Sequence, residues 1–259
     1  MSRNFELLQK IELEREIRER ESRRQLELGL NPIGCEPSAR HGDDAQPRLP
    51  MDESARAELN KLVQHLFIQP GASRAVVFSA VESGDGCSWI TARAATTLAA
   101  RVTGSVCVVD ANFHSPTLHR YFSIDNGHGL QHVPPHNESI KACAQRVLPS
   151  GNLWVITSAS EQLGDEKWVS GFHQRAGEIC REFDYVLFDA PPLALYSDAI
   201  AIAGAAADGI ALVVHANCTT RDMAKKVTQD IEKANGRLLG VVLNRGGTAI
   251  PEQVYRWLQ

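Results

Sequence analysis

A glycine-rich stretch, residues 79–97, holds the residue types that can bind phosphate. It contains Gly84, Gly86 and the hydroxyl of Ser88, followed by an alanine-rich run, and the apolar residues 75–78 precede it. A strand, a glycine loop and a helix in this order place backbone N–H groups at a helix N-terminus, where they can bind an anion. The sequence therefore predicts a phosphate-binding loop. A tight strand-to-helix turn without a ligand is the alternative.

The loop differs from nucleoside-triphosphate-binding loops at one position. Those loops end in Gly-Lys-Ser or Gly-Lys-Thr, and this one ends in Gly86-Cys87-Ser88. Cys87 is either an inert small side chain or a redox-reactive thiol, because a helix N-terminus can lower a thiol pKa. Trp89 is bulky enough to fill part of a nucleotide pocket, and the alternative is that it packs under the loop.

Length and composition exclude several classes of function. The chain has 259 residues, of which 43% are hydrophobic, which allows one α/β domain plus extra segments. The net charge of -4 gives no electrostatic case for nucleic acid as a partner. No apolar run reaches the ~18 residues that span a bilayer. The cysteines lack CxxC or Cys/His spacing, so we expect neither a disulfide framework nor a zinc site. This use of cysteine fits a reducing compartment, so we expect a cytoplasmic protein. They are Cys35, Cys87, Cys107, Cys143, Cys180 and Cys218.

The chain divides into three parts by composition. Residues 1–30 mix Glu and Arg at helical spacing and predict a charged N-terminal helix, which is either solvated or a docking helix. Residues 31–52 are rich in proline, glycine and polar residues and predict a disordered linker. Residues 53–259 are expected to form the folded domain, beginning with an amphipathic helix over 53–68.

Short apolar runs and helical stretches alternate from residue 74 onward. Such units predict an α/β fold with a doubly wound, mostly parallel sheet. Asp110 and Asp189 each end a strand, so they should lie with the glycine loop at the carboxyl edge, where such sheets bind ligands. The expected strands are residues 75–80, 106–110, 153–157, 185–189, 209–215 and 239–244. The expected helices are residues 89–101, 169–182, 198–206 and 221–234.

Several further motifs follow the glycine loop in a fixed order. They are Asp110-Ala111-Asn112-Phe113-His114-Ser115-Pro116, His119-Arg120-Tyr121-Phe122, Asp189-Ala190-Pro191-Pro192, Ser197-Asp198-Ala199 and Leu243-Asn244-Arg245. Their order resembles the cytoplasmic domain of the bacterial tyrosine kinases, the autokinases of capsule and exopolysaccharide biosynthesis, over about residues 54–248. These belong to the P-loop NTPase superfamily, and the resemblance makes the glycine loop a degenerate Walker A motif. Partition and septum-site ATPases are similar in fold and remain a third possibility.

The resemblance implies ATP and Mg²⁺ as cofactors and assigns the site residues. Ser88, Asp110 and Asp189 would bind the metal, and the two aspartates would be catalytic in an active enzyme. The alternative for Asp189 is that its carboxylate only caps a helix or turn. The alternative for Asn244 and Arg245 is that they form a simple turn at the end of a strand. The implied nucleotide-binding residues are Gly84, Asp85, Gly86, Cys87, Ser88, Trp89, Asn244 and Arg245.

The sequence departs from the family at several functional positions. Cys87 stands where the family has the lysine of the glycine loop. Asn112 stands where the family has the second aspartate of the acidic motif that begins at Asp110, and His114 stands where it has the arginine that follows. Only Tyr255 stands near the end of the chain, where the family has a tyrosine cluster, and it lies in an amphipathic stretch. The family oligomerises through Glu-x-x-Arg-x-x-Arg, and the matching residues here are Glu58, Lys61 and Gln64.

These departures predict a catalytically impaired kinase-like protein that acts as a regulator or scaffold in exopolysaccharide or capsule biosynthesis or export. Its expected partner is a membrane polysaccharide copolymerase or related export protein, which would recruit it to the inner face of the membrane. Homo-oligomers, or hetero-oligomers with an active kinase, are also expected. The alternative is an active ATP-dependent tyrosine kinase or ATPase that uses a non-standard lysine, such as Lys61 or one from a partner.

Overall fold

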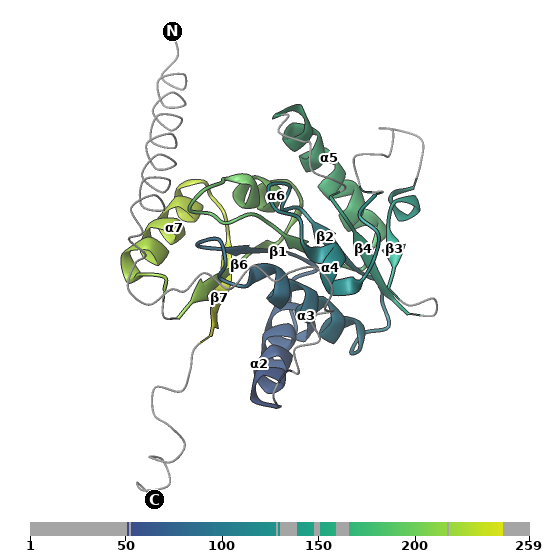
Figure 1. Cartoon of the computed structure of the whole chain (residues 1–259), viewed down its shortest axis with the longest axis horizontal. Coiled ribbons are helices and arrows are strands. Elements are labelled where there is room, and N and C mark those ends of the chain that lie inside the picture. The colour runs from purple at the N-terminus through teal and green to yellow at the C-terminus, as the bar shows by residue number, and fades with distance from the viewer. Residues whose placement is uncertain are drawn as a thin grey trace, which may run out of the picture. The chain divides into compact units, whose positions relative to one another are not determined.

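A seven-stranded sheet forms the centre of the protein, in the order β3-β4-β2-β5-β1-β6-β7 (Figure 1). The computed structural model describes residues 51, 53–127, 129, 139–147, 151–158, 166–216 and 218–245. Adjacent strands are parallel except for β3, which pairs antiparallel with β4. The strands are β1 (Ala75–Ala80), β2 (Val106–Asp110), β3 (Gln145–Arg146), β4 (Leu153–Ile156), β5 (Tyr185–Asp189), β6 (Gly209–His215) and β7 (Leu238–Asn244).

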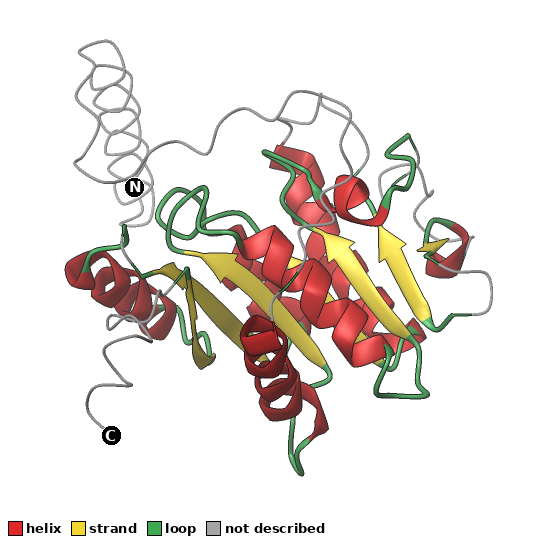
Figure 2. Cartoon of the chain, turned by 60° about the horizontal axis from the view of Figure 1, so that its bottom comes forward, coloured by secondary structure: helices red, strands yellow, loops and turns green. Residues whose placement is uncertain are grey.

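Helices cover both faces of the sheet (Figure 2). One face packs against α2 (Glu53–Val63), α3 (Cys87–Ala99) and α4 (Leu118–Phe122). The other packs against α5 (Glu166–Glu182), α6 (Asp198–Ala206) and α7 (Arg221–Lys233). A π-helical turn, Gln64–Ile68, extends α2, and a 3₁₀ turn, Ile140–Ala142, precedes β3.

The expected doubly wound, mostly parallel sheet is confirmed, and the predicted strands and helices agree with the structure to within three residues at each end. Three short elements were missed: β3, α4 and the 3₁₀ turn. They are two, five and three residues long, too short for a periodic pattern. The expectations for residues 1–50, and for Tyr255 near the end of the chain, lie outside the described residues.

The cysteines differ in state. Cys87, Cys107, Cys143 and Cys180 are free thiols. Cys218 is disulfide-bonded, so the expectation from spacing alone does not hold for this residue.

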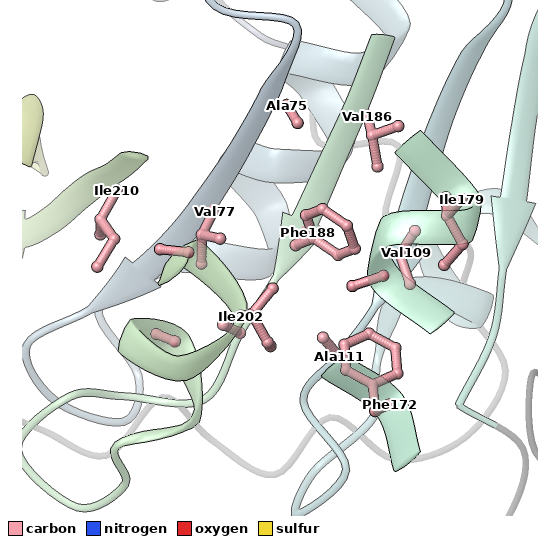
Figure 3. Close-up of a cluster of buried hydrophobic side chains, with 14 of the residues drawn as sticks. Ala75, Val77, Val109, Ala111, Phe172, Ile179, Val186, Phe188, Ile202 and Ile210 are labelled. Atoms are coloured by element: carbon pink, nitrogen blue, oxygen red, sulfur yellow. The ribbon is translucent and has the colours of Figure 1, made fainter. Parts of the chain in front are cut away.

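The core under α5 and α6 is built from strand side chains that point between the helices (Figure 3). Phe172 of α5 packs edge-to-face on Phe188 of β5, with ring centroids 6.2 Å apart, and on Phe113, with centroids 5.1 Å apart. Phe113 belongs to the loop after β2, and Phe188 precedes Asp189. Phe172 therefore supports both segments that lead from the sheet into the candidate site.

In the part of the chain that the structure describes, no helix is both long and apolar enough to cross a bilayer.

Substitution of Phe172 should test this support. Because its ring is fully buried between two other rings, we expect Phe172→Ala to lower the free energy of unfolding by about 3–5 kcal/mol. Phe172→Leu, which keeps most of the apolar volume, should cost roughly half of that. Urea unfolding measures both variants, and equal small losses would contradict the packing described.

Candidate functional site

The glycine loop joins β1 to α3 and is shaped by two left-handed glycines. Gly84 has a φ of 91° and Gly86 a φ of 85°, a region that disfavours residues with a side chain. A Cβ at Gly86 would also collide with the amide nitrogen of Asn244. Gly86 is the N-cap residue of α3 and has no side chain with which to cap this helix end. The first N–H groups of α3 therefore remain available to an anion, as the sequence predicts.

Asp85 holds the loop from inside. Its buried carboxylate accepts a hydrogen bond from the backbone N–H of Glu82 at 3.0 Å and one from the Thr219 hydroxyl at 3.5 Å. Burial raises the pKa of Asp85, although these hydrogen bonds and the charges of His215 and Arg245 oppose the shift. The sequence assigns Asp85 to nucleotide binding, and the structure directs its side chain to the loop's own backbone and to Thr219.

Asn244 clamps the same loop from β7. Its amide nitrogen donates to the carbonyl oxygen of Asp85 at 2.7 Å, and its amide oxygen accepts from the backbone N–H of Arg245 at 2.9 Å. Arg245 leaves the strand with a left-handed φ of 54°. Both residues thus lie beside the glycine loop, where the resemblance places the adenine edge. The contacts that the structure shows for Asn244 position the loop.

The Cys87 thiol lies under the loop. It is buried in the first turn of α3, 3.9 Å from the Thr91 hydroxyl. Burial and the negative charge of Asp189 raise the pKa of Cys87 well above its ordinary value. A reactive low-pKa thiol at the helix N-terminus is therefore the wrong interpretation, because burial beside a carboxylate outweighs the helix dipole.

Asp110 and Asp189 lie side by side, since they are register partners at the ends of β2 and β5. One Asp110 oxygen accepts backbone hydrogen bonds from Thr117 and Leu118, each at 3.0 Å, and the other accepts from Asn112 at 3.3 Å. Asp110 therefore already holds the turn that leads into α4.

Asp189 has an unused oxygen. Its Oδ1 accepts from the Thr91 hydroxyl at 3.5 Å, whereas its Oδ2 is buried and has no hydrogen-bond partner among the described residues. The role of a simple turn cap does not account for this atom. A carboxylate oxygen of this kind is a typical ligand for a hard cation.

The electrostatics of the pair also favour a cation. Burial, and secondly the Asp189 carboxylate, raise the pKa of Asp110. Burial likewise raises the pKa of Asp189, opposed by the polar groups of Ser88, Cys87 and Thr91. Two buried carboxylates without a cation favour retaining a proton. The residues present thus fit Mg²⁺, with Asp189 and Ser88 as ligands. No cluster of three or more His, Cys, Asp or Glu side chains occurs in the described part that could hold a metal without further ligands.

Trp89 packs along α3. It is partly buried against the core under α3, and the guanidinium of Arg93 lies 5.8 Å from its ring centroid. Its indole N–H is buried and has no partner among the described residues. This position in the first turn of α3 agrees with both interpretations of Trp89, packing under the loop and filling part of a nucleotide pocket.

Asn112 and His114, the two positions in the loop after β2 that differ from the family, both make contacts within the chain. The Asn112 side chain accepts from the backbone N–H of Ser115 at 3.3 Å. The His114 ring stacks on Tyr196, with centroids 3.7 Å apart and planes at 13°, and its Nε2 lies 3.4 Å from Asp198. Both side chains are therefore engaged within the chain.

Three residues around the site were not identified from the sequence: Thr91, Tyr196 and Thr219. Their contacts join segments far apart in the chain, so no local pattern signals them. Tyr121 of α4 belongs to a motif that the sequence did single out, and burial and then the Asp189 carboxylate raise the pKa of its phenol.

The predicted oligomerisation residues lie on α2 and the turn that follows it. Lys61 and Glu58 form an exposed ion pair at 2.7 Å. Gln64 accepts at 2.7 Å from Arg101, which also donates to the carbonyl of Asn60. Arg101 follows the end of α3, whose thirteen residues span about 20 Å at 1.5 Å per residue. Lys61 therefore lies at the opposite end of α3 from the glycine loop.

The raised pKa of Cys87 has a direct test. Because the thiolate is the nucleophile, we expect iodoacetamide at neutral pH to leave Cys87 unmodified in the native protein and to modify it in denaturant. Peptide mass spectrometry measures both. Rapid native modification would contradict the buried position.

The carboxylate pair should make stability depend on pH. Both folded-state pKa values are raised, so the folded chain holds protons that the unfolded chain has released above the ordinary aspartate pKa. The free energy of unfolding should therefore fall as pH rises from about 5 to 8, by up to about 1.4 kcal/mol per pH unit for each proton.

Removal of one charge should flatten this dependence. We expect the free energy of unfolding, measured in urea, to depend less on pH in Asp189→Asn and to keep its pH dependence in the exposed control Asp222→Asn. The same slope in wild type and Asp189→Asn would contradict the coupling of the two acids.

Comparisons with known proteins identify relatives of the chain among tyrosine-protein kinases. The chain is 30% identical over 176 residues to tyrosine-protein kinase YwqD of Bacillus subtilis, covering 66% of this chain and 72% of that kinase. It is 26% identical to the putative tyrosine-protein kinase CapB of Staphylococcus aureus, covering 66% and 75%. No protein-family model matches the chain.

Solved structures agree in fold. The chimerical protein CapA2B2 superposes with a TM-score of 0.67 at 22% identity, covering 78% of this chain and 88% of that one. The MinC:MinD cell division complex of Aquifex aeolicus gives a TM-score of 0.56 at 20% identity, covering 71% and 72%. The fold is thus of the P-loop NTPase type, and the identity to YwqD over most of its length shows that the chain belongs to the family of bacterial tyrosine-protein kinases.

Proposed function

We propose that this protein is a catalytically impaired tyrosine-kinase-like protein that acts as a regulator or scaffold in capsule or exopolysaccharide biosynthesis or export. The observation that carries the proposal is Cys87. The family has a lysine here, which offsets negative charge on the transferred phosphoryl group. Cys87 is instead a buried neutral thiol beside Asp189, with a raised pKa. Loss of one such charge typically costs about 3 kcal/mol or more of barrier, over a hundredfold in rate.

Two further contacts support impairment. Asn112 replaces a carboxylate with an amide that cannot take up a proton at neutral pH, and its side chain is used in a turn. His114, in place of an arginine, is stacked on Tyr196 and paired with Asp198. Neither side chain stands free to assist a transferring phosphoryl group.

The alternative, an active kinase or ATPase with a relocated lysine, has less support. Lys61 is paired with Glu58 and is separated from the glycine loop by the length of α3. A compensating cation would therefore have to come from a partner. The partition-type ATPases share the fold alone, whereas the sequence identity favours the tyrosine kinase branch.

The retained parts suggest that a nucleotide still binds. The left-handed glycines, the uncapped start of α3 and the unpartnered Asp189 oxygen fit phosphate and Mg²⁺. We propose ATP with Mg²⁺ as the ligand, cytoplasmic location, and recruitment to the inner face of the membrane by a polysaccharide copolymerase or related export protein. Relatives named CapB and EpsB support the polysaccharide assignment.

Purified protein with Mg-ATP tests both halves of the proposal. Because the positive charge is missing, we expect ATP turnover and phosphotyrosine no higher than in the Ser88→Ala, Asp189→Ala control. Activity clearly above that control would overturn the impairment.

Binding is measured separately as a thermal shift, since a ligand that binds only the folded state stabilises it. Mg-ATP should raise the melting temperature of wild type but not of Gly86→Ala, whose Cβ would meet Asn244. Gly177→Ala is the matched control, because a Cβ there has open space on α5. No shift in wild type would contradict nucleotide binding and leave a purely structural domain.

A further inference from the structure

One edge of the sheet exposes apolar side chains. Val241 is 57% and Leu243 is 64% exposed, both on the edge strand β7. Their register partners on β6 are Leu212 and Val214, which are buried. Paired residues of parallel strands face the same side of a sheet, so this face is covered over β6 and open over β7.

Helix α7 accounts for the difference. Its Val227 and Ile231 are buried in the same core cluster as Leu212 and Val214. The helix lies next to β7 at the yellow end of the chain (Figure 1). The ledge formed by Val241 and Leu243 thus lies alongside α7, at the margin of the core. Exposed apolar side chains next to each other on an edge strand favour a binding partner.

The chain itself supplies a matching segment just beyond β7. Residues 251–258 read Pro-Glu-Gln-Val-Tyr-Arg-Trp-Leu. Proline favours the first position of a helix. At 100° per residue, Val254, Trp257 and Leu258 fall on one face, and Glu252 and Arg256 fall on the opposite one.

We propose that residues 250–258 form an amphipathic helix that covers Val241 and Leu243. The dimensions agree, because two residues of strand span about 7 Å and one helical turn spans about 5.4 Å. The connection, residues 245–249, can reach about 17 Å when extended, and Gly246-Gly247 permits the chain to reverse. A short tether also gives an effective concentration in the millimolar range, which favours this segment over a second copy of the chain.

Such docking would act on the nucleotide loop. β7 ends at Asn244, whose amide holds the carbonyl of Asp85 and lies against Gly86. A helix that braces the end of β7 therefore also braces this clamp. The inference does not depend on whether the protein turns over ATP.

Hydrogen exchange of the full chain tests the proposal without altering β7. Trp257→Ser with Leu258→Ser removes the apolar face of the segment, and Glu252→Ser with Arg256→Ser alters the opposite face as a matched control. We expect the first pair to speed amide exchange in β7 about tenfold, while exchange in β2 and β5 stays the same. The control pair should leave β7 unchanged.

Two results would overturn the proposal. Equal β7 exchange in wild type and both variants would show that the segment does not cover the strand. Protection of β7 that rises with protein concentration, together with a dimer in light scattering, would assign the ledge to a second copy.

A crosslink gives an independent measurement. Leu243→Cys with Trp257→Cys should form a disulfide within one chain far faster than Leu243→Cys with Arg256→Cys, as read by peptide mass spectrometry. Equal rates for the two pairs would contradict the proposed orientation.

Discussion

Two buried carboxylates, Asp110 and Asp189, lie next to each other at the ends of β2 and β5. The electrostatic repulsion between their negative charges is the interaction on which the site around them depends. A protein can tolerate such a pair by retaining a proton, by adding hydrogen bonds or by binding a cation. Here the hydrogen bonds are unequal, since Asp110 accepts three from backbone and Asp189 has one bare oxygen. The bare oxygen beside Ser88 and Cys87 is where a cation would relieve the pair.

The residues that stand in place of the family's functional residues make contacts within the chain. Asn112 holds a turn, His114 stacks on Tyr196, and Gln64 binds Arg101. The Asn112 contact lies within the loop after β2, whereas the contacts of His114 and Gln64 reach segments that are distant in the sequence. These side chains therefore contribute to holding the loop after β2 and the α2–α3 pair in place, whatever happens to phosphoryl transfer.

The fold could be predicted because parallel strands buried on both faces are continuous apolar runs, as in residues 75–78 and 106–109. The edge positions of Asp110 and Asp189 followed from the same logic. The contacts that define the site could not be predicted, because they join distant segments. Asn244 meets Asp85 across 159 residues and Thr91 meets Asp189 across 98. The burial of Cys87 beside Asp189 could not be predicted either. The position at a helix N-terminus alone indicates a lowered pKa for this thiol, whereas burial and the Asp189 carboxylate raise it.

Binding and transfer of a phosphoryl group place different demands on a site of this kind, and the proposed function depends on this difference. Backbone N–H groups and a carboxylate that could hold a metal act on the ground state, and the described residues include both kinds of group. The lysine acts most strongly on charge that develops during transfer, and it is absent. A loop that keeps Gly84 and Gly86 left-handed, with Asp85 and Asn244 holding it, costs conformational freedom that a plain turn would not require. Retention of this geometry without the lysine is consistent with a site adapted to hold a nucleotide rather than to cleave it.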